Sequence, residues 1–158
     1  MDNKLMTFEN AAFGKIRTLT IDGEPWFVAV DVCRALEIGN PTDAMHRLDA
    51  DERTLVSIEG ASNGLPVNAV NEPGLYTLIL GSRKPEAKAF KRWITHEVIP
   101  AIRKYGGYMT KSLLEQVLEN PNLIYEFARR MLEEQQKNER LRQELDRAKP
   151  KADYYDAF

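Results

Sequence analysis

Residues 82–108 carry a concentration of positive charge that constrains how this chain can fold and what it can bind. The segment reads SRKPEAKAFKRWITHEVIPAIRKYGGY. Residues 83–104 have a formal net charge of +5, whereas residues 1–82 have −6 and residues 105–158 have −1. Seven basic side chains account for this charge: Arg83, Lys84, Lys88, Lys91, Arg92, Arg103 and Lys104.

The segment has the pattern of an amphipathic helix. Proline suits the first helical position, which Pro85 would occupy, and Gly106-Gly107 would end the helix. At about 100° per residue, four basic side chains share one face and four apolar ones lie roughly opposite. The first set is Lys84, Lys88, Lys91 and Arg92, and the second is Phe90, Trp93, Ile94 and Val98. Pro100 removes a backbone donor inside this pattern, so it predicts a kink or a split.

A run of charge on a helix is ordinarily a solvated face. Here the positive charge stands out against an acidic chain, which favours binding of a polyanion or an acidic protein surface. We therefore predict that the seven basic residues bind double-stranded DNA or a protein partner.

Length and composition are those of an ordinary globular protein. The 158 residues leave room for one domain and a helical appendage. A single cysteine, Cys33, fits a reducing compartment. The sequence shows no secretion signal, and the longest apolar run, residues 75–80, is too short to span a bilayer. These features predict a soluble protein of the cytoplasm without membrane contact.

The first half of the chain predicts a small antiparallel sheet of two hairpins. Residues 1–12 read as a loose lead-in. Residues 13–21 and 24–28 are apolar runs around Asp22-Gly23, which favours a type I′ turn. Residues 53–58 and 66–70 predict a second hairpin, whose longer loop contains Asn63-Gly64.

Short helices are expected between and after these strands. Residues 31–37 predict one that begins with Asp31 as an acceptor of free N–H groups and ends at Gly39. Asn40-Pro41 predicts the start of another, to about residue 48. The pair resembles a helix-turn-helix, but its shortage of basic residues argues against a place in a DNA groove. A further helix over residues 71–80 is closed by Gly81, which completes an α+β fold.

The C-terminal part predicts a helical extension that self-associates. A helix from Thr110 to Glu119 precedes a long one that starts at Asn120-Pro121 and ends at Lys149-Pro150. Residues spaced alternately by three and four along it form a coiled-coil seam, with the polar Asn138 at an a-type position. The predicted oligomerisation residues are Ile124, Phe127, Met131, Asn138, Leu141 and Leu145. A homodimer or tetramer is favoured over a single helix that packs on the first domain.

The sequence contains no recognisable reaction centre. It has none of the phosphate-loop, dinucleotide, zinc-protease or CxxC motifs. His46 and His96 stand alone, and Asp49, Asp51 and Glu52 read as a solvated acidic turn more readily than as a metal site. We predict neither enzymatic activity nor a cofactor or bound metal.

Several separated motifs resemble the N-terminal domain of the BRO family, which occurs in phage antirepressors and baculovirus BRO proteins. They are GEPWFVAVDVC at 23–33, NEPGLY at 71–76, SRKPEAKAFKRW at 82–93, EVIPAIR at 97–103 and GY at 107–108. The resemblance implies a Bro-N-like domain over residues 1–108, followed by a helical oligomerisation region at 109–150. Residues 151–158 resemble the lead into a C-terminal domain, which would then be missing from this chain.

The resemblance also implies a function. Proteins of this type relieve repression of lytic genes, and many bind the repressor itself. The expectation is therefore an antirepressor-type transcription regulator of a phage or prophage that binds a phage repressor, DNA or both. The alternative is a sequence-tolerant DNA-binding module that does not contact a repressor.

Overall fold

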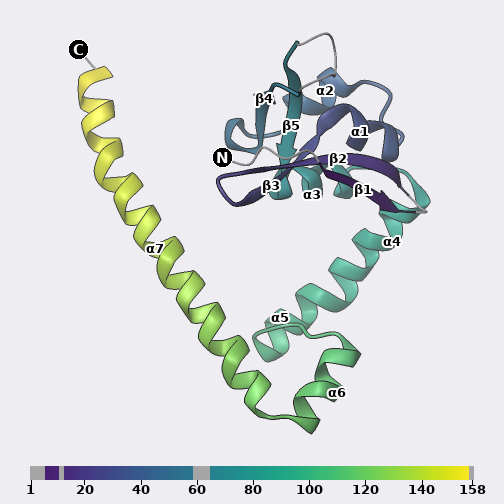
Figure 1. The fold of residues 1–158 in the computed structure, drawn as a ribbon, viewed down its shortest axis with the longest axis vertical. Helices are drawn as coiled ribbons and strands as arrows, with labels where there is room; N and C mark the ends of the chain where they lie inside the picture. Colours follow the sequence, from purple (N-terminus) through teal and green to yellow (C-terminus); the bar gives the residue numbers. More distant parts are fainter. Residues whose placement is uncertain (1–5, 11–12, 59–64, 157–158) are drawn as a thin grey trace. The chain divides into compact units, whose positions relative to one another are not determined.

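The computed structural model describes residues 6–10, 13–58 and 65–156, and side chains within residues 13–58 and 65–148. It divides into two compact units, Met1–Gly107 and Tyr108–Phe158, each of which is described by itself. The first unit combines a sheet with short helices, and the second is helical (Figure 1). The predicted α+β class is confirmed.

The sheet of the first unit is antiparallel throughout. Its strands among the described residues run in the order β1-β2-β3-β5-β4. They are β1 (Met6–Asn10), β2 (Gly14–Ile21), β3 (Glu24–Val28), β4 (Arg53–Val56) and β5 (Val67–Asn71). The lead-in prediction was wrong for residues 6–10, because they pair with β2 from Met6 opposite Thr18 to Asn10 opposite Gly14.

Both predicted hairpins are confirmed. Asp22 and Gly23 have φ angles of 52° and 80°, the two positive values that a type I′ turn needs. This turn sets the register that places Thr18 opposite Phe27. In the second hairpin Arg53 lies opposite Val70. The predicted turn residues Asn63-Gly64 lie outside the described residues.

The predicted helix start at Asn40 and the predicted helix over residues 71–80 are also confirmed. α2 (Pro41–His46) begins at Asn40, whose side chain accepts a hydrogen bond from the Asp43 N–H at 3.2 Å. α3 (Glu72–Leu80) begins at Asn71, whose side chain accepts from the Gly74 N–H at 3.0 Å. Each side chain satisfies a donor that the first helical turn leaves without a partner.

The first helix, α1 (Ala29–Ala35), differs from the prediction at both ends. It starts two residues early, and the Asp31 carboxylate does not cap it. It ends at Ala35, and the left-handed residue that turns the chain after it is Glu37, with a φ of 57°, and not Gly39. The Glu37 N–H donates to Arg34 O at 3.2 Å, and the Ile38 N–H donates to Cys33 O at 2.8 Å. This is the Schellman pattern, with a glutamate where glycine is usual.

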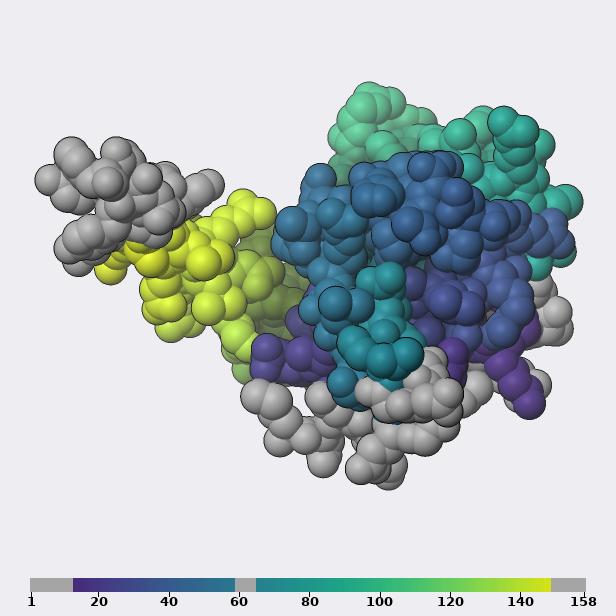
Figure 2. Space-filling model, turned by 90° about the horizontal axis from the view of Figure 1, so that it is seen from above, coloured from purple at the N-terminus to yellow at the C-terminus, as the bar shows by residue number. Residues whose placement is uncertain are grey.

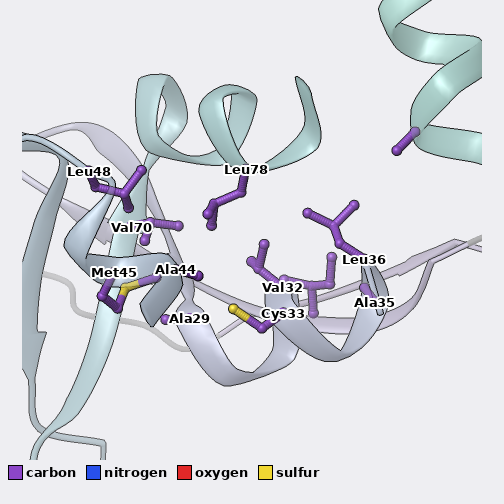
Figure 3. Close-up of a cluster of buried hydrophobic side chains, with 12 residues drawn as sticks. Ala29, Val32, Cys33, Ala35, Leu36, Ala44, Met45, Leu48, Val70 and Leu78 are labelled. Carbon is purple, nitrogen blue, oxygen red and sulfur yellow. The ribbon is translucent and has the colours of Figure 1, made fainter. Parts of the chain in front are cut away.

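The helices of the first unit pack against the sheet and form one hydrophobic core with it. Figure 3 shows side chains of α1, α2, β5 and α3 turned toward one another. Val32, Cys33 and Val70 are fully buried in it. Ile16 of β2 belongs to the same core, and so does Ala87, which fixes the first turns of the basic helix to the domain.

The basic segment forms one continuous helix with a π-helical turn in its middle. α4 (Pro85–Trp93) leads into the π turn η3 (Ile94–Val98) and then into α5 (Ile99–Tyr105). The Ile99 N–H donates to Ile94 O, five residues back. Pro100 lacks an N–H and its ring would clash with the carbonyl of residue 96, so the predicted break takes the form of a widened turn. Gly106, with a φ of 85°, ends the helix.

The second unit consists of α6 (Lys111–Glu119) and α7 (Asn122–Asp156). The Thr110 hydroxyl accepts from the Leu113 N–H at 3.2 Å, as a cap does. The prediction that Lys149-Pro150 ends the long helix was wrong, because α7 continues through Pro150. Ala148, Lys149, Lys151 and Ala152 favour the helix on both sides of the proline. Among the described residues, no helix combines the length and apolarity needed to cross a bilayer.

Candidate nucleic-acid interface

The basic helix is fixed to the domain by aromatic side chains of its inner face. The Phe90 ring stacks on Tyr76 of α3, with centroids 6.1 Å apart. Trp93 lies against Phe90 with a centroid distance of 5.7 Å. The Phe90–Tyr76 contact and the buried Ala87 attach α4 to the domain, whereas the contact between Trp93 and Phe90 lies within α4. In Figure 1, α4 starts at the body of the domain and leads away from the sheet toward α5.

Lys84 serves as an anchor at the start of this helix. Its ammonium group donates to Ala35 O at 2.8 Å, at the C-terminal end of α1. It also lies 5.4 Å from the ring centroid of Phe13. A cation is favourable beside the carbonyls that end a helix and over an aromatic face. Lys84 thus differs in its surroundings from the other six predicted binding residues.

Those six basic side chains are exposed. They are Arg83, Lys88, Lys91, Arg92, Arg103 and Lys104. We call this set the basic ridge. The space-filling view shows the teal segment that includes α4 at the surface of the domain (Figure 2).

The π turn determines how the two ends of the ridge line up. A π turn adds about one residue to a helical turn, so it shifts each later side chain by about 100° relative to a regular α-helix. With this shift, Arg103 falls within about 20° of Lys91, and Lys104 falls within about 20° of Arg92. In an uninterrupted α-helix Arg103 would fall within about 20° of Arg92, whereas Lys104 would have rotated away from α4's basic face. The π turn therefore extends one basic face from Lys88 to Lys104.

The same shift gathers the apolar side chains of α5 on the side opposite the ridge. Ile102 is 50% exposed and Tyr105 is 83% exposed, although both lie on the continuation of the face that α4 buries. The first unit thus presents a helix with a basic face and a partly uncovered apolar face. This feature could not be read from the sequence, because regular α-helical spacing scatters these residues around the axis.

A buried ion pair holds α1 against the sheet, and no local pattern in the sequence signals it. Asp31 is 2% exposed. Its carboxylate accepts from the Arg17 N–H at 2.9 Å, from Arg17 Nε at 2.8 Å and from an Arg17 terminal nitrogen at 3.0 Å. Arg34 donates to the same carboxylate at 3.3 Å. Burial raises the pKa of Asp31, but the hydrogen bonds and charge of Arg17 outweigh it and lower that pKa overall.

The described residues do not assemble a recognisable reaction centre. A cavity of about 450 Å³ lies among apolar side chains, including Phe27, Leu75 and Phe90, and offers no group for acid–base chemistry. Burial raises the pKa of the Cys33 thiol, which makes it a poor nucleophile. The carboxylates of Asp49, Asp51 and Glu52 lie within 4.8 Å of one another at the turn η1 (Ala50–Glu52), where Glu52 accepts from the Asp49 N–H.

The predicted oligomerisation residues lie along α7. Ile124, Met131, Leu141 and Leu145 are exposed, as is Asn138. Phe127 is half-buried. A stripe of exposed apolar side chains on a long helix is typical of a surface that a further partner covers.

Comparison with known proteins supplies an independent line of evidence. The family model for the N-terminal domain of the BRO family matches residues 15–100. An uncharacterized protein of Haemophilus influenzae is 38% identical over 89 residues, which cover 54% of this chain and 43% of that protein. A putative Bro-N domain-containing protein of Invertebrate iridescent virus 3 is 28% identical over 137 residues, which cover 65% of this chain and 34% of that protein.

A putative Bro-N domain-containing protein of Invertebrate iridescent virus 6 is 27% identical over 126 residues, covering 66% of this chain and 30% of that protein. The chain thus spans less than half the length of these relatives. No solved structure matches it. Because the family model matches more than half of the chain, this protein belongs to the BRO family and carries its N-terminal domain at residues 15–100.

Proposed function

We propose that this BRO-family protein is an antirepressor-type transcription regulator whose first unit binds double-stranded DNA through the basic ridge. The N-terminal domain of this family is regulatory rather than enzymatic. The related proteins of two iridescent viruses fit a viral or prophage setting. The observation that carries the proposal is the π turn, because it brings Lys104 onto the basic face of α4 while Arg103 stays on that face.

The ridge suits phosphate binding for three reasons. Its six side chains are exposed, so binding need not remove them from buried ion pairs. The helix that bears them is held by Ala87 and Phe90, so little conformational entropy is lost on binding. Lysine and arginine side chains on one face reach phosphates along a duplex and supply affinity that does not depend on sequence. In this proposal Arg83 reaches a base edge. The other five ridge residues contact phosphates: Lys88, Lys91, Arg92, Arg103 and Lys104.

Fluorescence anisotropy of a labelled duplex tests the proposal. The ridge variant Lys88→Glu/Arg92→Glu reverses two charges on α4. The control variant Lys15→Glu/Arg47→Glu makes the same change in net charge at two exposed positions that do not belong to the ridge. We expect the ridge variant to lose binding at low salt and the control to retain most of it. Equal losses in both variants would attribute binding to net charge and contradict a site on the ridge.

A second candidate function is docking to a repressor protein, and two observations support it. Ile102 and Tyr105 add exposed apolar surface on the side of the helix opposite the ridge, and apolar contacts are typical of protein interfaces. Residues 1–82 supply an acidic surface with a net charge of −6, which could meet a basic repressor. Release of operator DNA from the repressor of the same phage or prophage, on addition of this protein, is the result this candidate predicts. An intact repressor–operator complex in excess protein would contradict it.

A further inference from the structure

The exposed seam of α7 has a pattern that discriminates between the two orientations of a paired helix. Its a-type positions are Ile124, Met131, Asn138 and Leu145, and its d-type positions are Phe127, Glu134, Leu141 and Ala148. Met131 is 58% exposed, Leu141 is 48% exposed and Leu145 is 68% exposed. A heptad seam of this length buries its apolar side chains against a second helix. A second copy of the same chain fits this role, because the seam can be matched to itself.

A parallel pair would bring like charges together. In that orientation each residue of the seam faces its own copy, so Glu134 would face Glu134 in the interior. Beside the seam, Lys137 would lie next to Arg142 of the second copy, which adds a second repulsion. Two buried carboxylates without a cation between them are costly. The parallel orientation therefore conflicts with the sequence at its centre.

An antiparallel pair removes both conflicts. An a-type residue then faces a d-type residue. When the two seams overlap over their full length, Asn138 of each helix faces Glu134 of the other, so this contact occurs twice. The Asn138 amide can donate to the carboxylate. The layers on either side are apolar: Met131 against Leu141, and Phe127 against Leu145.

Charges beside the seam also match in this register. Arg130 lies beside Glu144 of the second copy, again twice, which is an attractive pair at the edge of the seam. Lys137 approaches its own copy, but the two Glu134 carboxylates lie next to this pair and balance its charge. All these side chains are exposed in the single chain, so they are available to a partner.

We propose that α7 pairs with α7 of a second copy in the antiparallel orientation, with Asn138 of each helix facing Glu134 of the other. This pairing does not depend on DNA binding, but it sets the distance between the two helix starts. The starts of α7 in the two copies lie about 40 Å apart along the pair, because about 28 residues at 1.5 Å each separate them. A parallel pair would place these starts side by side.

Disulfide trapping in the full chain tests the orientation. Chains carrying Met131→Cys and chains carrying Leu141→Cys, with tags of different size, are mixed and oxidised. Cys33 stays in place because it is fully buried. We expect the mixed disulfide between the two kinds of chain, because Met131 and Leu141 share a layer. Self-linked Met131→Cys is not expected, since its two copies lie about 15 Å apart in the antiparallel pair and a disulfide needs Cα atoms within about 7 Å.

Efficient self-linking of either chain, or the absence of any disulfide, would overturn the proposal. Exchange of the charges at Arg130 and Glu144 gives a second test, which does not alter the apolar residues of the seam. Sedimentation should show an Arg130→Glu dimer about ten-fold weaker than the wild type, with recovery in Arg130→Glu/Glu144→Arg. Arg140→Glu makes the same charge change off the seam and should leave the dimer unchanged. A double variant as weak as the single one would contradict the register.

Discussion

The Lys84 ammonium group donates to the Ala35 carbonyl oxygen at 2.8 Å, across 49 residues of sequence. This bond ties the first turn of the basic helix to the last turn of α1. It also separates Lys84 from the six exposed cations of the basic ridge. The segment that reads as uniformly basic in the sequence thus contains an anchor and a candidate binding surface.

The anchor predicts that Lys84→Gln affects stability more than binding. We expect a loss of about 1–2 kcal/mol in the free energy of unfolding, since a charge-assisted bond and a favourable charge at a helix end are removed. Urea denaturation measures it. DNA affinity should fall less than in Lys88→Gln, which serves as the matched variant on the ridge. If Lys84→Gln left the stability unchanged and weakened DNA binding as much as Lys88→Gln does, Lys84 would be a binding residue and not an anchor.

The buried carboxylate of Asp31 predicts a stability that depends on pH. Arg17 lowers the pKa of Asp31 in the folded protein, so the contribution of Asp31 is fully present above the unfolded pKa of about 3.9. It is lost as the pH falls through the folded pKa. Asp31→Asn should lower the free energy of unfolding at pH 7 by about 2–4 kcal/mol, because it leaves a partly buried guanidinium without its anion. Thermal unfolding between pH 2 and pH 7, about the range of the titration, should show a weaker acid dependence in the variant.

The left-handed Glu37 predicts a substitution that stabilises the protein. Glycine adopts a positive φ without the clash of a Cβ atom, so Glu37→Gly should raise the free energy of unfolding by about 0.5–1 kcal/mol. Gly39→Ala is the control, because Gly39 has no positive φ and open space beside it. In the same urea titration it should raise the free energy of unfolding by up to about 1 kcal/mol, because alanine restricts the unfolded chain and meets no clash there. Destabilisation by Glu37→Gly would mean that the glutamate side chain contributes more than its backbone strain costs.

Local signals in the sequence predicted the backbone correctly where a few neighbouring residues determine it, as at the turn Asp22-Gly23 and the helix start Asn40-Pro41. They failed where a residue's structure depends on a partner far away in the sequence. The Asp31 carboxylate leaves its own helix for Arg17, which lies 14 residues away in the sequence. The strand β1 forms because β2 offers an edge, which residues 6–10 do not reveal by themselves.

For the candidate site, the sequence identified the basic residues but not their arrangement. Six of the seven are exposed, and regular helical spacing described α4 well. The π turn was not foreseen, although Pro100 correctly marked a disturbance of the helix. Since a single added residue in a turn rotates everything after it, Arg103 and Lys104 could not be assigned to a face from the sequence.

The π turn predicts that an insertion weakens DNA binding and that a deletion at the same place does not. Deletion of Thr95 lets the segment become a regular α-helix while Arg103 keeps its angle to Lys91, so DNA affinity should change little. Insertion of one alanine after Thr95 rotates Arg103 and Lys104 by about 100° and should weaken binding. Circular dichroism checks that both variants are folded, and anisotropy compares their affinities. Equal affinities would show that the ridge does not act as one face.

The most direct test of the central claim is the salt dependence of DNA binding. If the five ridge cations other than Arg83 contact phosphates, the logarithm of the association constant should fall with the logarithm of salt concentration at a slope of about −4.5. In Lys88→Gln/Arg92→Gln the slope should become shallower by about 2, because two contacts are lost. A wild-type slope near zero, or a slope that the two substitutions leave unchanged, would contradict DNA binding by the basic ridge.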